Sequence, residues 1–156
     1  MYLLPKPKTI KEQDGQMLLC HSTHIVMTKE VAETEMHAAK RLQEAIRQET
    51  GLILPFSVGE VREGDLSLGI AKTLPEQTYE ITIDEKGGQI SGGDGAGVLY
   101  GVETFCQIVQ QCGGILPCVQ IQDAPDMPNR GYYFDQKGTC VKTGRTQKNC
   151  RQDVPL

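Results

Sequence analysis

The chain of 156 residues contains no tryptophan, few aromatic residues and no long apolar run. No stretch approaches the roughly 20 apolar residues that a membrane-spanning helix requires, so the sequence predicts no membrane partner. Its first residues, MYLLPKPKTIKEQDG, lack the basic region, the apolar region and the cleavage site of a secretory signal. The chain as written is therefore expected in the cytoplasm, whereas export of a longer parent protein stays open.

Basic residues are too few for a nucleic-acid surface. Lysine and arginine number 16 against 20 aspartate and glutamate, which gives a formal net charge of −4. A chain of this balance has no broad surface for neutralising phosphates, so no nucleic-acid partner is expected. Its length and its 38% apolar content suit one domain with a core of its own.

Cysteine spacings typical of a metal site are also missing. An even count of six invites a disulfide framework, but without a signal peptide the thiols normally stay reduced, and a domain of this size needs no covalent staples. Cys20, His21 and His24 could supply metal ligands. Without a CxxC or HExxH spacing we interpret them as polar residues beside a strand, and we expect neither a metal nor a cofactor. The cysteines are Cys20, Cys106, Cys112, Cys118, Cys140 and Cys150.

Hydrophobic periodicity predicts alternating strands and helices. Gly51 follows the first predicted helix at a position where helices commonly end. The order predicts an α/β (α+β) sandwich, in which one mixed β-sheet carries two helices packed on one face. The predicted segments are extended chain at 16–28 with a buried strand at 25–27, a helix at 33–49, strands at 52–58 and 65–71, a hairpin at 78–93 around Gly87 and Gly88, a helix within 92–112, and a strand within 113–125.

The stretch GGDGAGVLYGVETFCQIVQQC, residues 92–112, runs from a glycine-rich turn into a helix. Glycines before a helix start can let the backbone bind a phosphate. Here, however, the turn follows a hairpin late in the chain and lacks a Walker lysine. We favour a structural role in which Asp94 caps the helix, while Gly97 and Gly101 lie on one face and let it approach the sheet closely. A small nucleotide-binding protein stays as an alternative.

The last part of the chain differs in composition. After Asp135 there is no apolar period, and residues 131–156 carry five basic against two acidic residues. Such a segment buries too little apolar surface to order itself. We predict that residues 136–156 are a disordered tail or the product of a frameshift, which the coding DNA would reveal.

Residues 78–135 resemble the end of the non-catalytic N-terminal domain of glycoside hydrolase family 20, the β-N-acetylhexosaminidases, and its junction with the catalytic barrel. The resemblance is carried by YEITI, GAGVLYGVETFCQ, LPCVQIQDAP and RGYYFD, read in order. An accessory domain of another sugar hydrolase, such as family 84, is the alternative. The matching positions are Tyr79, Gly97, Tyr100, Gly101, Thr104, Gln107, Leu116, Pro117, Ile121, Asp123, Pro125, Arg130, Gly131 and Asp135.

The resemblance implies a zincin-like accessory domain at residues 1–125, and a junction with a first barrel strand at 126–135. In the family a neighbouring Asp and Glu on a (β/α)8 barrel act together, and the substrate's own acetamido group is the nucleophile. A barrel needs roughly 250 residues, so the chain is expected to be catalytically silent alone. Arg130 matches the arginine that binds sugar hydroxyls in the family.

Two further expectations concern carboxylates and surfaces. Asp84 and Glu85 are adjacent, but they lie at the predicted hairpin turn and point to opposite sides of a strand, so we do not assign them to catalysis. The partner implied by the resemblance is the catalytic barrel of a longer parent. The sheet or helix face meant for that barrel would be exposed and apolar, which makes self-association or a protein-interaction module a further alternative.

Overall fold

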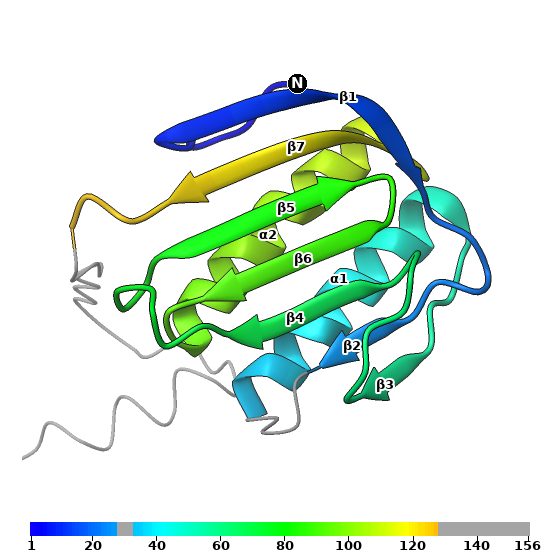
Figure 1. Cartoon of the computed structure of the whole chain (residues 1–156), viewed down its shortest axis with the longest axis horizontal. Coiled ribbons are helices and arrows are strands. Elements are labelled where there is room, and N and C mark those ends of the chain that lie inside the picture. The colour runs from blue at the N-terminus through cyan, green and yellow to red at the C-terminus, as the bar shows by residue number, and fades with distance from the viewer. Residues whose placement is uncertain (28–32, 128–156) are drawn as a thin grey trace, which may run out of the picture. The chain divides into compact units, whose positions relative to one another are not determined.

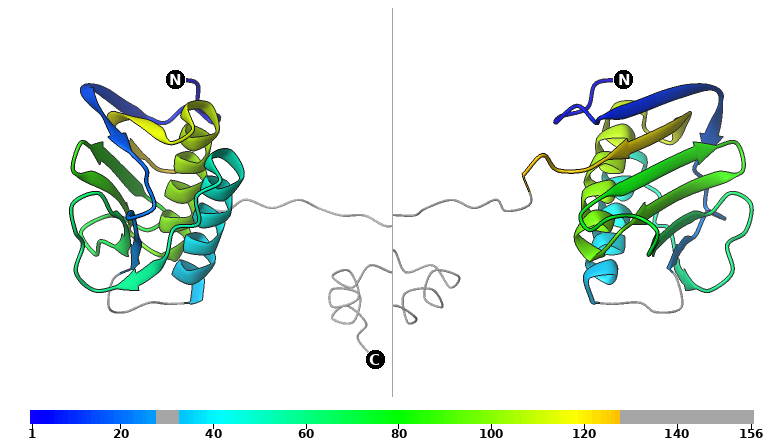
Figure 2. Two further views of the ribbon diagram at one scale, coloured as in Figure 1. Left: turned by 90° about the vertical axis from the view of Figure 1, so that its right-hand side faces the viewer. Right: turned by 60° about the vertical axis from the view of Figure 1, so that its left-hand side comes forward.

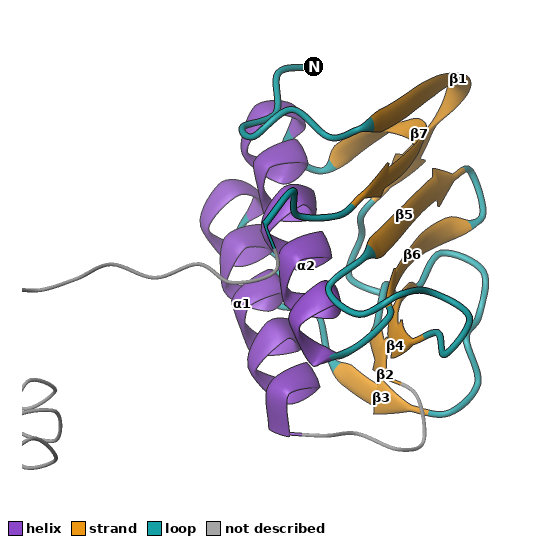
Figure 3. Ribbon diagram, turned by 90° about the vertical axis from the view of Figure 1, so that its left-hand side faces the viewer, coloured by secondary structure: helices purple, strands orange, loops and turns teal. Residues whose placement is uncertain are grey.

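A mixed sheet carries two helices on one of its faces in the computed structural model, which describes residues 1–27 and 33–127 (Figure 1). Figure 3 shows the helices side by side against the sheet, all on the same side of it. The predicted fold class is confirmed at this level. The elements are β1 (Thr9–Leu18), β2 (Ile25–Met27), α1 (Glu33–Thr50), β3 (Phe56–Val58), β4 (Leu66–Ile70), β5 (Tyr79–Asp84), β6 (Gly87–Gly92), α2 (Gly95–Cys112) and β7 (Ile115–Asp123).

The sheet has the strand order β1-β7-β5-β6-β4-β2-β3. The first four strands of this order, β1, β7, β5 and β6, pair antiparallel. β6, β4, β2 and β3 pair parallel. Tyr79 at the start of β5 lies opposite both Gly92 at the end of β6 and Asp123 at the end of β7. The last residues of β6 and β7 therefore lie at the same end of the strands. Thr9 at the start of β1 pairs with Gln122 there. The chain therefore enters β1 and leaves β7 at the same end of these strands.

The first helix forms because small and branched apolar residues recur on one face. Ala38, Leu42 and Ile46 are buried completely, at helical spacing. The helix ends where Thr50 donates its hydroxyl hydrogen bond to the carbonyl of Ile46 at 2.6 Å. Gly51 then adopts φ +76°, which is the left-handed conformation that glycine accepts at a helix end. The predicted helix and its stop are confirmed.

The second helix lies beside the first and over the centre of the sheet, as the turned views in Figure 2 show. Val98, Val102, Phe105 and Val109 are fully buried between it and the strands. On the outer side of the pair, the Arg41 guanidinium binds the Glu103 carboxylate through two hydrogen bonds of 2.9 and 3.2 Å. Apolar burial thus fixes the helices to the sheet, and this ion pair joins them to each other.

Two strands differ from the sequence prediction. β1 begins at Thr9, whereas the pattern predicted extended chain from Gln16 onward. The predicted strand at 52–58 is reduced to Phe56–Val58, because Pro55 directly before it cannot donate to a ladder. β1 is also irregular, since its register with β7 shifts between Glu12 and Gln16.

The described residues set limits on the remaining predictions. Met1–Asp126 form one compact unit. Nearly all of the predicted junction at 126–135, including Arg130, and the whole predicted tail at 136–156 lie outside the described residues. Within the described part of the chain, neither helix is long and apolar enough to cross a membrane.

Candidate functional site

The turn before α2 is occupied by a carboxylate of the chain itself. Asp94 is the residue before the helix, and its Oδ1 accepts hydrogen bonds from the backbone N–H of Gly97 at 2.7 Å and of Gln77 at 3.1 Å. A helix start attracts anions through its free N–H groups and its dipole. A phosphate here would meet the Asp94 carboxylate instead. The predicted cap is confirmed, and the geometry favours it over a phosphate site.

The glycines around this turn are needed for close packing. A Cβ at Gly97 would fall on the carbonyl oxygen of Thr78, and one at Gly101 would lie 2.7 Å from Cγ2 of Ile90 and 3.3 Å from Cδ2 of Tyr79. Real Cβ atoms essentially never come within 3.0 Å of another heavy atom, which excludes the contacts with Thr78 and Ile90. The absence of side chains at these two positions therefore lets α2 rest on β5 and β6. This confirms the packing interpretation of the two glycines.

Three of the residues that carried the family resemblance form a buried hydroxyl network. Tyr79 is 4% exposed and Thr104 is 8% exposed. The Tyr79 hydroxyl lies 2.7 Å from Thr104 Oγ1 and donates to Asp123 Oδ2 at 3.3 Å. Burial raises the pKa of Tyr79 to about 12, and the negative charge of Asp123 acts in the same direction. The phenol is therefore a neutral hydrogen-bonding group that joins β5, α2 and the end of β7.

The same carboxylate also holds the segment before β1. The backbone N–H of Lys8 donates to Asp123 Oδ1 at 3.2 Å, and the Lys8 ammonium lies 3.0 Å from the Asp126 carboxylate. The ion pair is exposed and contributes little on its own. Asp123 accepts from two separate segments, so it fixes the place where the chain leaves the sheet. Nothing local in the sequence indicates the role of Lys8.

A fourth motif residue, Gln107, binds the backbone of the N-terminal segment. Its side-chain amide accepts from the N–H of Leu4 at 2.9 Å and donates to the carbonyl of Leu4 at 2.8 Å. Gln111 makes the same pair of bonds to Tyr2, at 2.9 and 2.6 Å. Sequence reasoning gave no role to Gln111. These contacts link residues more than 100 positions apart, which no sequence period reports.

The adjacent Asp84 and Glu85 lie where the sequence placed them. Asp84 ends β5, and its Oδ1 accepts from the N–H of Lys86 at 2.8 Å across the turn. Both carboxylates are exposed to solvent. The two catalytic carboxyl groups of a glycosidase flank the same bond, whereas adjacent residues of a strand point to opposite sides. Asp84 instead stabilises the hairpin turn through its hydrogen bond from Lys86.

Cys20, His21 and His24, which the sequence analysis considered as metal ligands and interpreted as polar residues beside a strand, belong to no metal-binding cluster in the described part of the chain. Within the described residues there is no cluster of three His, Cys, Asp or Glu side chains that could hold an ion.

Asp65 is 4% exposed and accepts backbone hydrogen bonds from His24 and Arg62, both at 2.9 Å. It organises two loops. The hydroxyl of Ser22, 3.1 Å from Cys20 Sγ, lowers the pKa of that exposed thiol.

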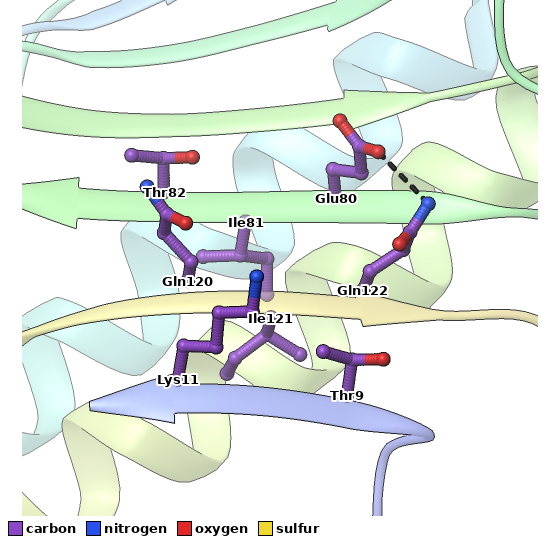
Figure 4. Close-up of a pocket in the computed structure, with 8 residues that line it drawn as sticks. All are labelled: Thr9, Lys11, Glu80, Ile81, Thr82, Gln120, Ile121 and Gln122. Atoms are coloured by element: carbon purple, nitrogen blue, oxygen red, sulfur yellow. Dashed lines mark hydrogen bonds between the residues drawn. The ribbon is translucent and has the colours of Figure 1, made fainter.

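The outer face of the sheet is polar over β1, β7 and β5. A shallow hollow of about 270 Å³ lies across β1, β7 and β5 (Figure 4). Gln122 donates to Glu80 at 3.0 Å across the strands. Outward positions in this region carry amide, hydroxyl and charged groups, so an apolar docking face, which the sequence analysis allowed on either the sheet or the helices, does not lie over these three strands. The hollow is lined by Thr9, Lys11, Glu80, Ile81, Thr82, Gln120, Ile121 and Gln122.

A family model identifies the family of the chain. The family model described as glycosyl hydrolase family 20, domain 2, matches residues 1–124. A Beta-hexosaminidase from Vibrio furnissii is 29% identical over 135 residues, which cover 85% of this chain and 21% of that protein. The chain spans about a fifth of the length of the relatives that it matches.

Solved structures share the fold. The X-ray structure of a chitobiase from Flavobacterium johnsoniae matches with a TM-score of 0.71 and 20% identity, over 84% of this chain and 22% of that one. The structure of CpGH84D matches with a TM-score of 0.69 and 18% identity, over 84% of this chain and 25% of that one. At these identities the likeness concerns the fold alone.

Proposed function

Because the chain belongs to glycosyl hydrolase family 20, domain 2, over residues 1–124, we propose that it is the accessory domain of a β-N-acetylhexosaminidase-type glycosidase. In this role it supports a catalytic (β/α)8 barrel and does no chemistry alone. The observation that carries the proposal is which groups the motif residues bind. Tyr79, Thr104, Gln107 and Asp123 all bind other parts of the same domain, so they serve its architecture.

The size of the chain supports the same proposal. It accounts for 21% of the length of the Vibrio furnissii relative, which leaves most of that protein for another part. The compact unit Met1–Asp126 supports a domain at about 1–125 followed by a junction at 126–135. We assign Arg130 to sugar binding in a complete parent, by resemblance only. A zincin-like description of the domain is supported by its mixed sheet with two helices on one face.

Hydrolysis of an aryl N-acetylglucosaminide tests the proposal. The purified chain is expected to release no aryl alcohol above the buffer background, while a complete family 20 hexosaminidase in the same assay releases it rapidly. The assignment of catalysis to a separate barrel would be wrong if the hydrolytic activity co-elutes with the folded chain in gel filtration and is lost when the chain is unfolded.

A family 84 origin was the alternative within the same class. The fold does not separate the two, since family 20 and CpGH84D structures match with similar TM-scores. The match to the family 20 model over residues 1–124 favours family 20.

A nucleotide-binding protein was the alternative of a different class. The Asp94 carboxylate at the start of α2 opposes it. Unchanged amide resonances of Gly93–Gly101 on titration with a mononucleotide would agree with this choice.

A further inference from the structure

Residues 2–4 lie along α2 in the manner of a β-strand. The side chains of Tyr2 and Leu4 are 71% and 61% exposed, whereas Leu3 between them is 4% exposed and belongs to the core. This alternation has the period of extended chain. At both exposed positions the backbone N–H and C=O turn to the helix, where Gln111 and Gln107 bind them. The segment thus pairs with side chains in place of a neighbouring strand.

The spacing of the two glutamines explains why they can do this. Residues four apart on a helix lie on one face, about 6 Å apart along the axis. Alternate residues of an extended chain are separated by about 6.6 Å. The two repeats nearly agree, so Gln107 and Gln111 can each engage one of two alternate residues of an extended chain. Gln111 also donates to the carbonyl of Gln107 at 3.1 Å, which orients its amide.

Each glutamine recognises backbone rather than side chain. A primary amide offers one acceptor oxygen and N–H donors, and this matches the single N–H and C=O of one residue. The four bonds, at 2.6–2.9 Å, use no atom of the Tyr2 or Leu4 side chains. Side-chain selection is left to the position of Leu3, whose side chain enters the core.

We propose that Gln107 and Gln111 form a peptide clamp: a binding site on α2 for an extended segment with an apolar residue between its two clamped residues. In this chain residues 2–4 occupy the clamp. The recognition mode is that of strand addition, with main-chain hydrogen bonds for affinity and one pocket for selection. The inference is independent of the hexosaminidase assignment, because it rests on contacts within the described residues alone.

Amide hydrogen exchange in the full chain provides the first test. Gln107→Ala is expected to speed exchange of the Leu4 amide about tenfold, which corresponds to the loss of about one hydrogen bond. Gln110→Ala is the matched control, since Gln110 is an exposed glutamine on the same helix. The Ile81 amide in central β5 reports that each variant stays folded. Equal Leu4 exchange in the two variants would overturn the clamp.

The apolar position gives the second test. Leu3→Ala is expected to speed exchange at both Tyr2 and Leu4, because the buried anchor between the clamped residues is lost. Leu4→Ala removes an exposed side chain of the same kind and is expected to leave the Tyr2 amide unchanged. If the two variants behave alike, the core position does not select the peptide and the proposal is wrong.

Binding in trans gives the third test. A synthetic peptide with the sequence of residues 1–7 is titrated to millimolar concentration onto the full-length Leu3→Ala chain. In this variant residues 2–4 are expected to leave the clamp unoccupied. The side-chain amide resonances of Gln107 and Gln111 are expected to shift, while those of Gln110 stay in place. The same peptide carrying Ala at position 3 is expected to give no shift. Failure of the native peptide to move either resonance would contradict a peptide site.

Discussion

Replacing Gly97 by alanine separates close packing from every other explanation of the glycine-rich turn. The new Cβ would fall on the carbonyl oxygen of Thr78, a backbone atom that cannot rotate away. The same carbonyl accepts the hydrogen bond of the Gly93 N–H at 2.9 Å. Relief of the clash therefore requires α2 to move away from the sheet, or requires the turn at residues 92–94 to lose this bond.

The expected size of the effect follows from two opposing contributions. Overpacking against a rigid neighbour costs about 1–3 kcal/mol, and weakening the Gly93 hydrogen bond costs about 1 kcal/mol more. Alanine in place of glycine inside a helix gains up to about 1 kcal/mol. We expect Gly97→Ala to lower the free energy of unfolding by about 1–3 kcal/mol. In an open turn the same substitution would raise it, so the sign alone is informative.

Urea unfolding followed by far-ultraviolet circular dichroism measures this difference. With a slope of about 2 kcal/mol per M, a loss of 2 kcal/mol moves the midpoint down by about 1 M. Gly114→Ala is the matched control, because its Cβ would have Cγ2 of Thr50 as its nearest neighbour, at an ordinary 3.6 Å. We expect that variant to stay within about 0.5 kcal/mol of the native chain. A Gly97→Ala midpoint at or above the native one would refute the packing argument.

Two further outcomes are expected. Tyr79→Phe removes the hydroxyl that joins Thr104 and Asp123 and is expected to cost about 1–2 kcal/mol in urea unfolding, whereas Tyr2→Phe at an exposed position should cost little; equal costs would deny the network a role. Burial raises the pKa of the Cys106 thiol from 9.0 to about 12 and that of the Tyr79 phenol from 10.0 to about 12. The unfolded chain therefore loses these protons first, and stability should fall above pH 9, by about 1 kcal/mol between pH 9 and 10 from Cys106. Cys106→Ala should flatten that decline, and an unchanged slope would contradict it.

The elements that sequence patterns predict well are those with one buried face. α1 carries alanine, leucine and isoleucine on a single stripe, and β5 alternates buried and half-buried residues along its length. Asp94 was equally accessible to prediction, because its hydrogen bond reaches only three residues ahead. In each case the physical cause is local, and a local cause leaves a period or a spacing in the chain.

β1 shows what such patterns miss. It lies at the edge of the sheet, and most of its ten residues are exposed on both faces. Met17 is its single buried residue, and one buried position leaves no alternation to detect. Its irregular register, with Gly15 at φ +106°, interrupts the pattern further. What fixes β1 is its pairing with β7, about 100 residues away in the sequence.

The residues of the candidate site also differ in how much the sequence could predict about them. The resemblance identified Tyr79, Thr104, Gln107 and Asp123 as a set, but only the folded chain shows that three of them share one network while the fourth binds the N-terminal segment. Lys8 and Gln111 carried no sequence signal, because their partners are backbone groups and carboxylates brought close by tertiary contacts. Motif membership thus indicated importance, and the structure supplied the contacts.

The position of β7 between β1 and β5 has a consequence for biosynthesis. β1 is made first, yet its partner strand is the last element of the domain to leave the ribosome. At about 5–20 residues per second, β1 must wait on the order of 6–20 s before Gln122 can meet Thr9. The nascent domain cannot close its sheet during that interval, and in a longer parent it would close only after synthesis of the following part has begun.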